Sequence, residues 1–185
     1  MDAVGLQSFL LVLASEMGDK TQLLALVLAS KFKKPWTIMA GILLATLVNH
    51  GLASLLGAEI SALIPAGLLN RILALTFIAF AVWLLIPDKE DGLKWSEKYG
   101  AFITTTIAFF LAEMGDKTQL ATVALGARFQ APVMVTIGTT AGMLVADGLA
   151  VFLGERLTRR ISMKWIHWAA AALFAVFGLT LLFQG

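Results

Sequence analysis

The sequence predicts an all-α integral membrane protein, with six transmembrane helices arranged as two inverted three-helix repeats. Three observations predict this fold class: the composition, the length of the apolar stretches and an internal repeat. Of the 185 residues, 59% are hydrophobic and only 14% are charged, whereas soluble domains are about 45–50% apolar and about 25% charged. A soluble fold of this size cannot bury so much apolar surface, and this excludes the soluble classes.

Apolar stretches of about 20 residues, long enough to span a bilayer, occur six times along the chain. We expect the first stretch to be a retained span and not a signal peptide, because its only early charge is Asp2 and it continues through further charged residues without a cleavage site. Short polar segments separate the stretches. The predicted spans are residues 4–30, 36–57, 68–86, 101–127, 132–154 and 165–183.

The basic residues lie mostly on one side of these spans. The loops after spans one, three and five hold ten of them, and the other side holds Arg71 and Arg128. Because loops rich in Lys and Arg stay in the cytoplasm, we expect these three loops to be cytoplasmic and both termini to lie outside. The ten residues are Lys31, Lys33, Lys34, Lys89, Lys94, Lys98, Arg156, Arg159, Arg160 and Lys164.

The two halves of the chain repeat each other. Residues 16–23, EMGDKTQL, recur identically at 113–120, and the same offset aligns Gly41 with Gly138. Each of these glycines begins a pattern of small residues, Gly41-x-x-x-Ala45 and Gly138-x-x-x-Gly142, that predicts close helix packing. Each half has three spans, an odd number, so the second copy enters the bilayer from the opposite face, as in many secondary transporters. We therefore expect a first repeat at 1–86, a cytoplasmic linker at 87–100 and a second repeat at 101–185, together forming a single membrane domain.

The repeated octapeptides lie at the centres of spans one and four, where each ionisable group costs about 2.5–3.5 kcal/mol. Six such groups must therefore contact one another, water or an ion. Four carboxylates and two ammonium groups carry a net charge of −2, which one divalent cation neutralises, and oxygen ligands suit Mg, Ca or Mn. The candidate ligands are Glu16, Asp19, Glu113, Asp116, Gln22 and Gln119, supported by Lys20, Lys117, Thr21 and Thr118.

The spacing within each octapeptide predicts its local structure. Glu16 and Lys20 are four residues apart, the spacing at which helical side chains pair. Gly18 and Gly115 weaken the helix within each motif, and a local opening there would free backbone carbonyls, as in the broken helices of transporters. The alternative is that both octapeptides are structural salt bridges that hold spans one and four together.

Other polar residues inside the spans extend this site. Asn49 in span two and Asp147 in span five are expected to add oxygen ligands to it. His50 is expected to be a hydrogen-bonded helix residue, with a role in proton transfer as the alternative. His167 is expected to reach towards the membrane interface.

The two E-x-G-D-K-T motifs, one on the first span of each half, resemble the signature of the Gdt-type divalent cation exchangers. This family includes Golgi manganese/calcium transporters and bacterial manganese exporters, and the resemblance covers essentially the whole chain. It implies a cation:proton (or sodium) exchanger that removes Mn(II), sometimes Ca(II), from the cytosol, with the metal on Glu16, Asp19, Glu113 and Asp116. The chain is short and lacks the N-terminal extension of eukaryotic members, which points to a bacterial plasma (inner) membrane.

The expected function is secondary-active export of manganese(II) by alternating access. The metal is the substrate, protons or sodium ions are the counter-ion, and no cofactor, nucleic acid or enzymatic activity is expected. There is no P-loop pattern that would indicate ATP binding. The alternatives are a calcium:proton antiporter on the same scaffold and, less favoured by the acidic motifs, an exporter of organic solutes. The oligomeric state stays open.

Overall fold

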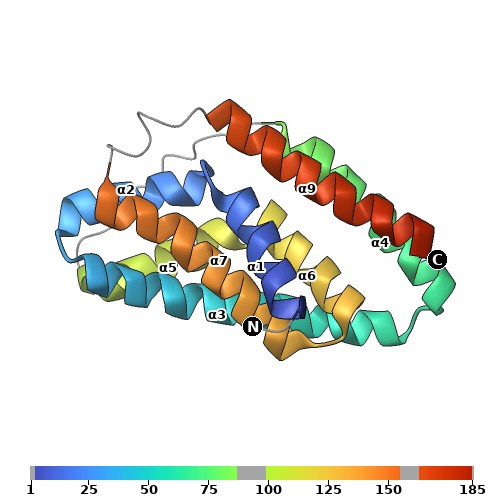
Figure 1. Cartoon of the computed structure of the whole chain (residues 1–185). Helices are drawn as coiled ribbons and strands as arrows, with labels where there is room; N and C mark the ends of the chain where they lie inside the picture. Colours follow the sequence, from blue (N-terminus) through green and yellow to red (C-terminus); the bar gives the residue numbers. More distant parts are fainter. Residues whose placement is uncertain (1–2, 87–98, 155–162, 185) are drawn as a thin grey trace.

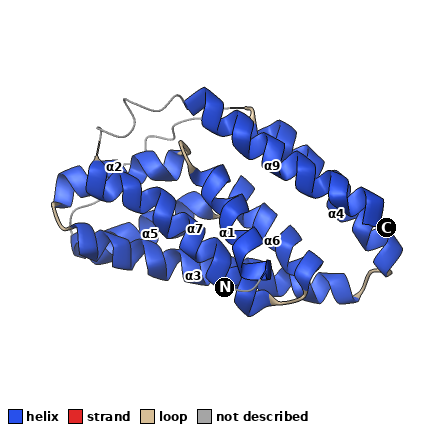
Figure 2. Cartoon of the chain, viewed as in Figure 1, coloured by secondary structure: helices blue, strands red, loops and turns tan. Residues whose placement is uncertain are grey.

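The computed structural model describes residues 3–86, 99–154 and 163–184, and these ranges are helical without any strand (Figures 1 and 2). This confirms the all-α prediction for the described residues. Most of the expected linker, residues 87–98, lies outside these ranges, as do Arg156, Arg159 and Arg160. The helices are α1 (Ala3–Glu16), α2 (Lys20–Phe32), α3 (Pro35–Ala62), α4 (Ala66–Leu84), α5 (Gly100–Glu113), α6 (Lys117–Phe129), α7 (Pro132–Leu153) and α9 (Met163–Gln184).

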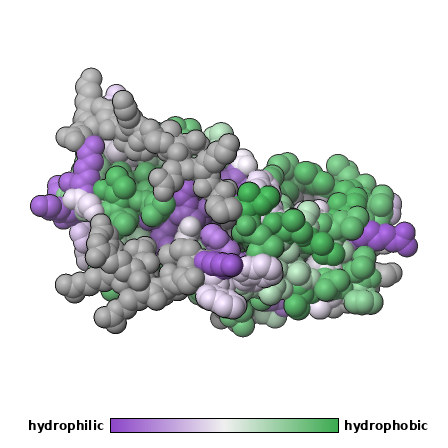
Figure 3. Space-filling model, turned by 90° about the horizontal axis from the view of Figure 1, so that it is seen from above, coloured by the Kyte–Doolittle hydropathy of each residue, from purple (hydrophilic) through white to green (hydrophobic). Residues whose placement is uncertain are grey.

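The helices and the surface are those of a multi-pass membrane protein. Four helices are long and apolar enough to cross a bilayer, namely α3, α4, α7 and residues 164–183 of α9. Large apolar side chains face outward, and Leu63 and Phe183 are 84% and 87% exposed. Apolar residues cover a broad part of the described surface (Figure 3). Such a surface is stable only against lipid or another apolar partner.

The predicted spans 4–30 and 101–127 are not continuous helices. Each is divided at its octapeptide, into α1 and α2 in the first half and α5 and α6 in the second. Gly18 and Gly115 lie in these turns with φ angles of 85° and 77°, a conformation that glycine adopts without strain. The helix therefore opens at each motif, as expected from the two glycines.

The same local geometry continues beyond the motifs in both halves. Lys33 and Gln130 end α2 and α6 in the left-handed conformation, with φ angles of 52° and 50°. Pro35 and Pro132 then begin α3 and α7, at a position where the missing proline N–H has no helical partner to lose. Each of these pairs is separated by the offset of the sequence repeat.

Helices of one half pack against helices of the other. α1 lies on α7, α3 contacts α5 and α6, and α4 lies beside α9 (Figure 1). A Cβ atom on Gly41 would be 3.0 Å from the carbonyl oxygen of Phe102, and one on Gly138 would overlap the carbonyl oxygen of Gly5. These two crossings are related by the repeat offset, and both confirm that the small residues on spans two and five allow close helix packing.

Candidate metal centre

Three buried carboxylates from the two halves lie together at the helix breaks. Oxygen atoms of Glu16, Asp19 and Asp116 are all within 4.8 Å of one another. Glu16 ends α1, while Asp19 and Asp116 immediately precede α2 and α6. Two oxygens on opposite sides of one calcium ion, at about 2.3–2.6 Å each, are about 4.6–5.2 Å apart. The spacing of the three carboxylates therefore fits one divalent cation.

Glu16 is held by one threonine from each octapeptide. Thr21 Oγ1 donates a hydrogen bond of 2.8 Å to Glu16 Oε2, and Thr118 Oγ1 donates to Glu16 Oε1. Thr118 also lies 3.5 Å from the hydroxyl of Ser15. A carboxylate has about four acceptor positions, so Glu16 keeps acceptor capacity while both threonines fix its orientation. The bond from Thr118 connects the second half of the chain to the first.

The two glutamines of the motifs stabilise the turns. The backbone N–H of Gly18 donates to Gln22 Oε1 at 3.0 Å, and that of Gly115 donates to Gln119 Oε1 at 2.7 Å. The amide nitrogen of Gln22 donates to the carbonyl oxygen of Ala146 in α7, at 2.8 Å. In this structure both expected glutamine ligands therefore hold their own turns, and Gln22 also contacts the opposite half.

Glu113 is placed differently from Glu16, although the same seven residues follow both. Its side chain is fully buried, but it is not part of the group of three carboxylates. Neither of its oxygens accepts a hydrogen bond from a described donor, because Thr118, five residues further along the motif, donates to Glu16 instead. Asp116, Glu16 and Asp147 are close enough to act on its charge.

Polar residues of α3 and α7 are also buried near the motifs. Asp147 is fully buried, near enough to act on the charge of Glu113, and neither of its oxygens has a hydrogen-bond partner among the described residues. Asn49 donates from its amide nitrogen to the carbonyl oxygen of Phe110 in α5, at 3.1 Å. Within the described chain neither ring nitrogen of His50 has a hydrogen-bond partner.

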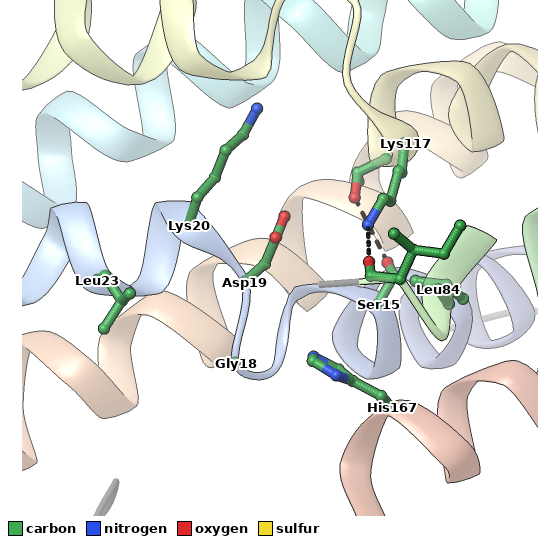
Figure 4. Close-up of a pocket in the computed structure, with 10 residues that line it drawn as sticks. Ser15, Gly18, Asp19, Lys20, Leu23, Leu84, Lys117 and His167 are labelled. Atoms are coloured by element: carbon green, nitrogen blue, oxygen red, sulfur yellow. Dashed lines mark hydrogen bonds between the residues drawn. The ribbon is translucent and has the colours of Figure 1, made fainter. Parts of the chain in front are cut away.

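A cavity of about 180 Å³ lies beside the carboxylates (Figure 4). Its wall includes Asp19, Lys20, Lys117 and His167. His167 was expected near the interface, and the packing of α9 brings it to this wall. The cavity is also lined by Ser15, Gly18, Leu23, Leu84, Ile86 and Thr118.

The two lysines of the motifs have different surroundings. Lys117 Nζ donates to the carbonyl oxygen of Ile86, just beyond α4, at 3.0 Å, and lies 5.7 Å from the ring centre of Trp83. Lys20 lines the cavity and is near enough to act on the charge of Glu16, although the helix breaks between the two residues.

Comparisons with known proteins relate the whole chain to one family of transporters. The family model described as "Divalent cation/proton antiporter GDT1" matches residues 4–92 and 101–185. A "Putative manganese exporter" of Vibrio cholerae is 43% identical over 173 residues, which are 93% of this chain and 86% of that protein. "Protein PAM71-homolog, chloroplastic" of Arabidopsis thaliana is 31% identical over 95% of this chain and 58% of its own length. "GDT1-like protein sll0615" of Synechocystis is 28% identical over 92% of each chain. No solved structure matches the chain.

Proposed function

This chain belongs to the GDT1 family of divalent cation/proton antiporters, and from that premise we propose that it exports manganese(II) from the cytosol in exchange for protons. Family membership makes it a divalent cation transporter and points away from an enzyme. The observation that carries the proposal is the group formed by Glu16, Asp19 and Asp116. Three buried carboxylates from both halves of a membrane protein are costly unless a cation neutralises them.

The proposed cargo site begins with these three carboxylates and extends to neighbouring acids. Glu113 and Asp147 are buried without described hydrogen-bond donors, so their oxygens are available when a cation brings the halves together. Lys20 and Lys117 limit the net negative charge of the site, and Thr21 and Thr118 hold Glu16 in place. We propose that the oxygens of Asn49, Gln22 and Gln119 are additional ligands in other steps of the cycle.

The transport mechanism we propose is alternating access between two inverted three-helix repeats, residues 1–86 and 101–185. In this arrangement α1 and α2 together form one span, as do α5 and α6, giving six spans in a bacterial inner membrane. Both termini face outward, and the linker of residues 87–100 is cytoplasmic. The cavity supports entry from the cytosol, because its wall includes the end of α4 and the beginning of α9, next to loops expected on that side. External protons would then compete with the metal for the carboxylates.

Calcium is the second candidate substrate. The distances between the carboxylate oxygens fit Ca(II), and hard oxygen ligands suit Ca(II) as well as Mn(II). The name of the Vibrio cholerae relative favours manganese. Sodium is the alternative counter-ion. An exporter of organic solutes is less favoured, because the cavity of about 180 Å³ is lined by charged groups.

Transport by the purified protein in liposomes tests the proposal. We expect a pH gradient, and not a sodium gradient, to drive Mn(II) uptake, with Ca(II) and Mg(II) as weaker competitors. Glu16→Gln together with Glu113→Gln should abolish uptake, whereas Glu59→Gln, at an exposed position of α3, should retain it. Full Mn(II) transport by the double variant would refute the carboxylate site, and transport of calcium in place of manganese would favour the second candidate.

A further inference from the structure

A second cavity, a groove of about 380 Å³, lies between α1, α6 and α9. Its base includes Leu11 and Leu181, each only 2% exposed. The rings of Phe129 and Phe177 also line it and contact each other, with centroids 6.1 Å apart. Leu10 and Val176 form the more exposed sides, at 43% and 60%. None of the residues around this groove lines the cavity beside the carboxylates.

Polar side chains lie at one end of this groove. Gln7 is about one turn before Leu10 in α1, towards the beginning of that helix. Arg128 is the penultimate residue of α6. Thr180 lies one turn beyond Val176, towards the end of α9. In the proposed six-span arrangement, the beginning of α1 and the ends of α6 and α9 reach the same membrane boundary. The groove is therefore polar at the headgroup level and apolar further into the bilayer.

We propose that this groove binds one anionic phospholipid, with its phosphate on Arg128 and an acyl chain along Leu10 and Val176. Arg128 is the only charged residue among the described residues that line the groove. A guanidinium group presents five N–H donors in a planar fork that matches phosphate. An acyl chain fills an apolar groove that opens towards hydrocarbon.

The polar end of the groove favours an anionic phospholipid over a zwitterionic lipid, and the apolar part favours it over a free phosphate ion. A zwitterionic lipid fills the apolar part equally well, but its cationic group opposes Arg128, so charge complementarity selects an anionic headgroup. A free phosphate ion would use Arg128 and leave the apolar length of the groove empty. The lipid proposal rests on the membrane arrangement of the helices and not on metal transport. The lipid proposal and the proposed manganese transport can therefore fail separately.

Native mass spectrometry of the protein released from nanodiscs of equal phosphatidylglycerol and phosphatidylcholine tests the proposal. The wild-type protein should retain one phosphatidylglycerol in preference to phosphatidylcholine. Arg128→Gln should lower that retention about tenfold, the loss expected for one charge-assisted hydrogen bond. The matched control is Arg71→Gln, an exposed arginine of α4 on the same predicted side, which should retain the lipid as the wild type does.

A second variant tests the apolar part of the groove. Val176→Trp places a bulky ring there and should reduce retention of both lipids, even if Arg128→Gln fails to fold. Equal retention of the two lipids by the wild type, or undiminished phosphatidylglycerol on Arg128→Gln, would overturn the proposal. So would a protein that retains no lipid and forms a dimer that Val176→Trp disrupts, because the groove would then be an interface between copies. Binding of free phosphate without any bound lipid would also overturn it.

Discussion

Replacement of Asp19 by Asn removes one charge from the proposed metal centre while leaving the fold in place. Asp19 is the N-cap of α2, but its side chain makes no capping hydrogen bond, and Asn is as favourable as Asp at an N-cap. Asp116 is less suitable, because its carboxylate accepts a bond from the backbone N–H of Gln119 at 2.7 Å. Asp19→Asn therefore changes the charge of the site with little effect on the turn.

The expected effect follows from the spacing of the carboxylates. Two unit charges 4 Å apart attract each other by about 4 kcal/mol at an effective dielectric constant of about 20. A bound dication would lie closer than that to each of three oxygens that are within 4.8 Å of one another. Desolvation offsets part of this attraction. If half of the attraction remains, its loss costs about 2 kcal/mol, which corresponds to roughly a 30-fold rise in the Kd for Mn(II). We expect Asp19→Asn to weaken Mn(II) binding by at least that factor.

The binding constant can be measured by electron paramagnetic resonance, because free aqueous Mn(II) gives a signal that is lost on binding. Purified protein in detergent is titrated with Mn(II) at one fixed pH. Glu59→Gln removes a carboxylate from an exposed position and should leave Kd unchanged. If Asp19→Asn binds Mn(II) as tightly as the wild type, the three-carboxylate group is not the metal site.

Three further changes probe the surroundings of the centre. Gly138→Ala should lower the stability measured by thermal unfolding by about 1–3 kcal/mol through overpacking, because the added Cβ overlaps α1. Gly51→Ala is the control and should be neutral or stabilising, because its added Cβ would lie 4.0 Å from the nearest atom. Thr118→Val should reduce Mn(II) transport about tenfold by removing a hydrogen bond to a buried carboxylate, and Thr118→Ser should restore it; equal rates for both would contradict this role. Lys117→Met should increase maleimide labelling of a single cysteine introduced at the end of α4, because the lysine's bond to that segment is lost. Lys20→Met should leave this labelling unchanged, and since the chain has no cysteine of its own, the signal comes from one site.

Much of this architecture could be predicted from the repeat. The charged octapeptides at the centres of two apolar stretches indicated a site inside the membrane, and Gly18 and Gly115 indicated where the helices break. The small residues at Gly41 and Gly138 indicated the close crossings. These features depend on local sequence and on membrane energetics, both of which can be read without coordinates.

The contacts within the site could not be predicted in the same way. The helical spacing expected for Glu16 and Lys20 assumed a continuous helix, but the helix breaks between the two residues. His167 reaches the cavity only because of how α9 packs. The sequence also could not indicate that three carboxylates, and not four, would come within 4.8 Å, since the same octapeptide holds Glu113 and Glu16.

The difference between two identical octapeptides is itself informative about mechanism. Thr21 and Thr118 both donate to Glu16 and leave Glu113 without a described donor. The motifs are identical, but the residue before each glutamate differs, with Ser15 in one half and Ala112 in the other. The hydroxyl of Ser15 lies 3.5 Å from that of Thr118, so the asymmetry follows from this difference as well as from the packing of the surrounding helices. In the mechanism that we propose, a rearrangement that exchanged the two environments would give Glu113 the threonine bonds but not the contact with Ser15. A modest difference in affinity for a metal ion or protons would be enough to shift the population between two states of similar free energy. Two repeats that are asymmetric at any one moment would supply such a pair of states for alternating access.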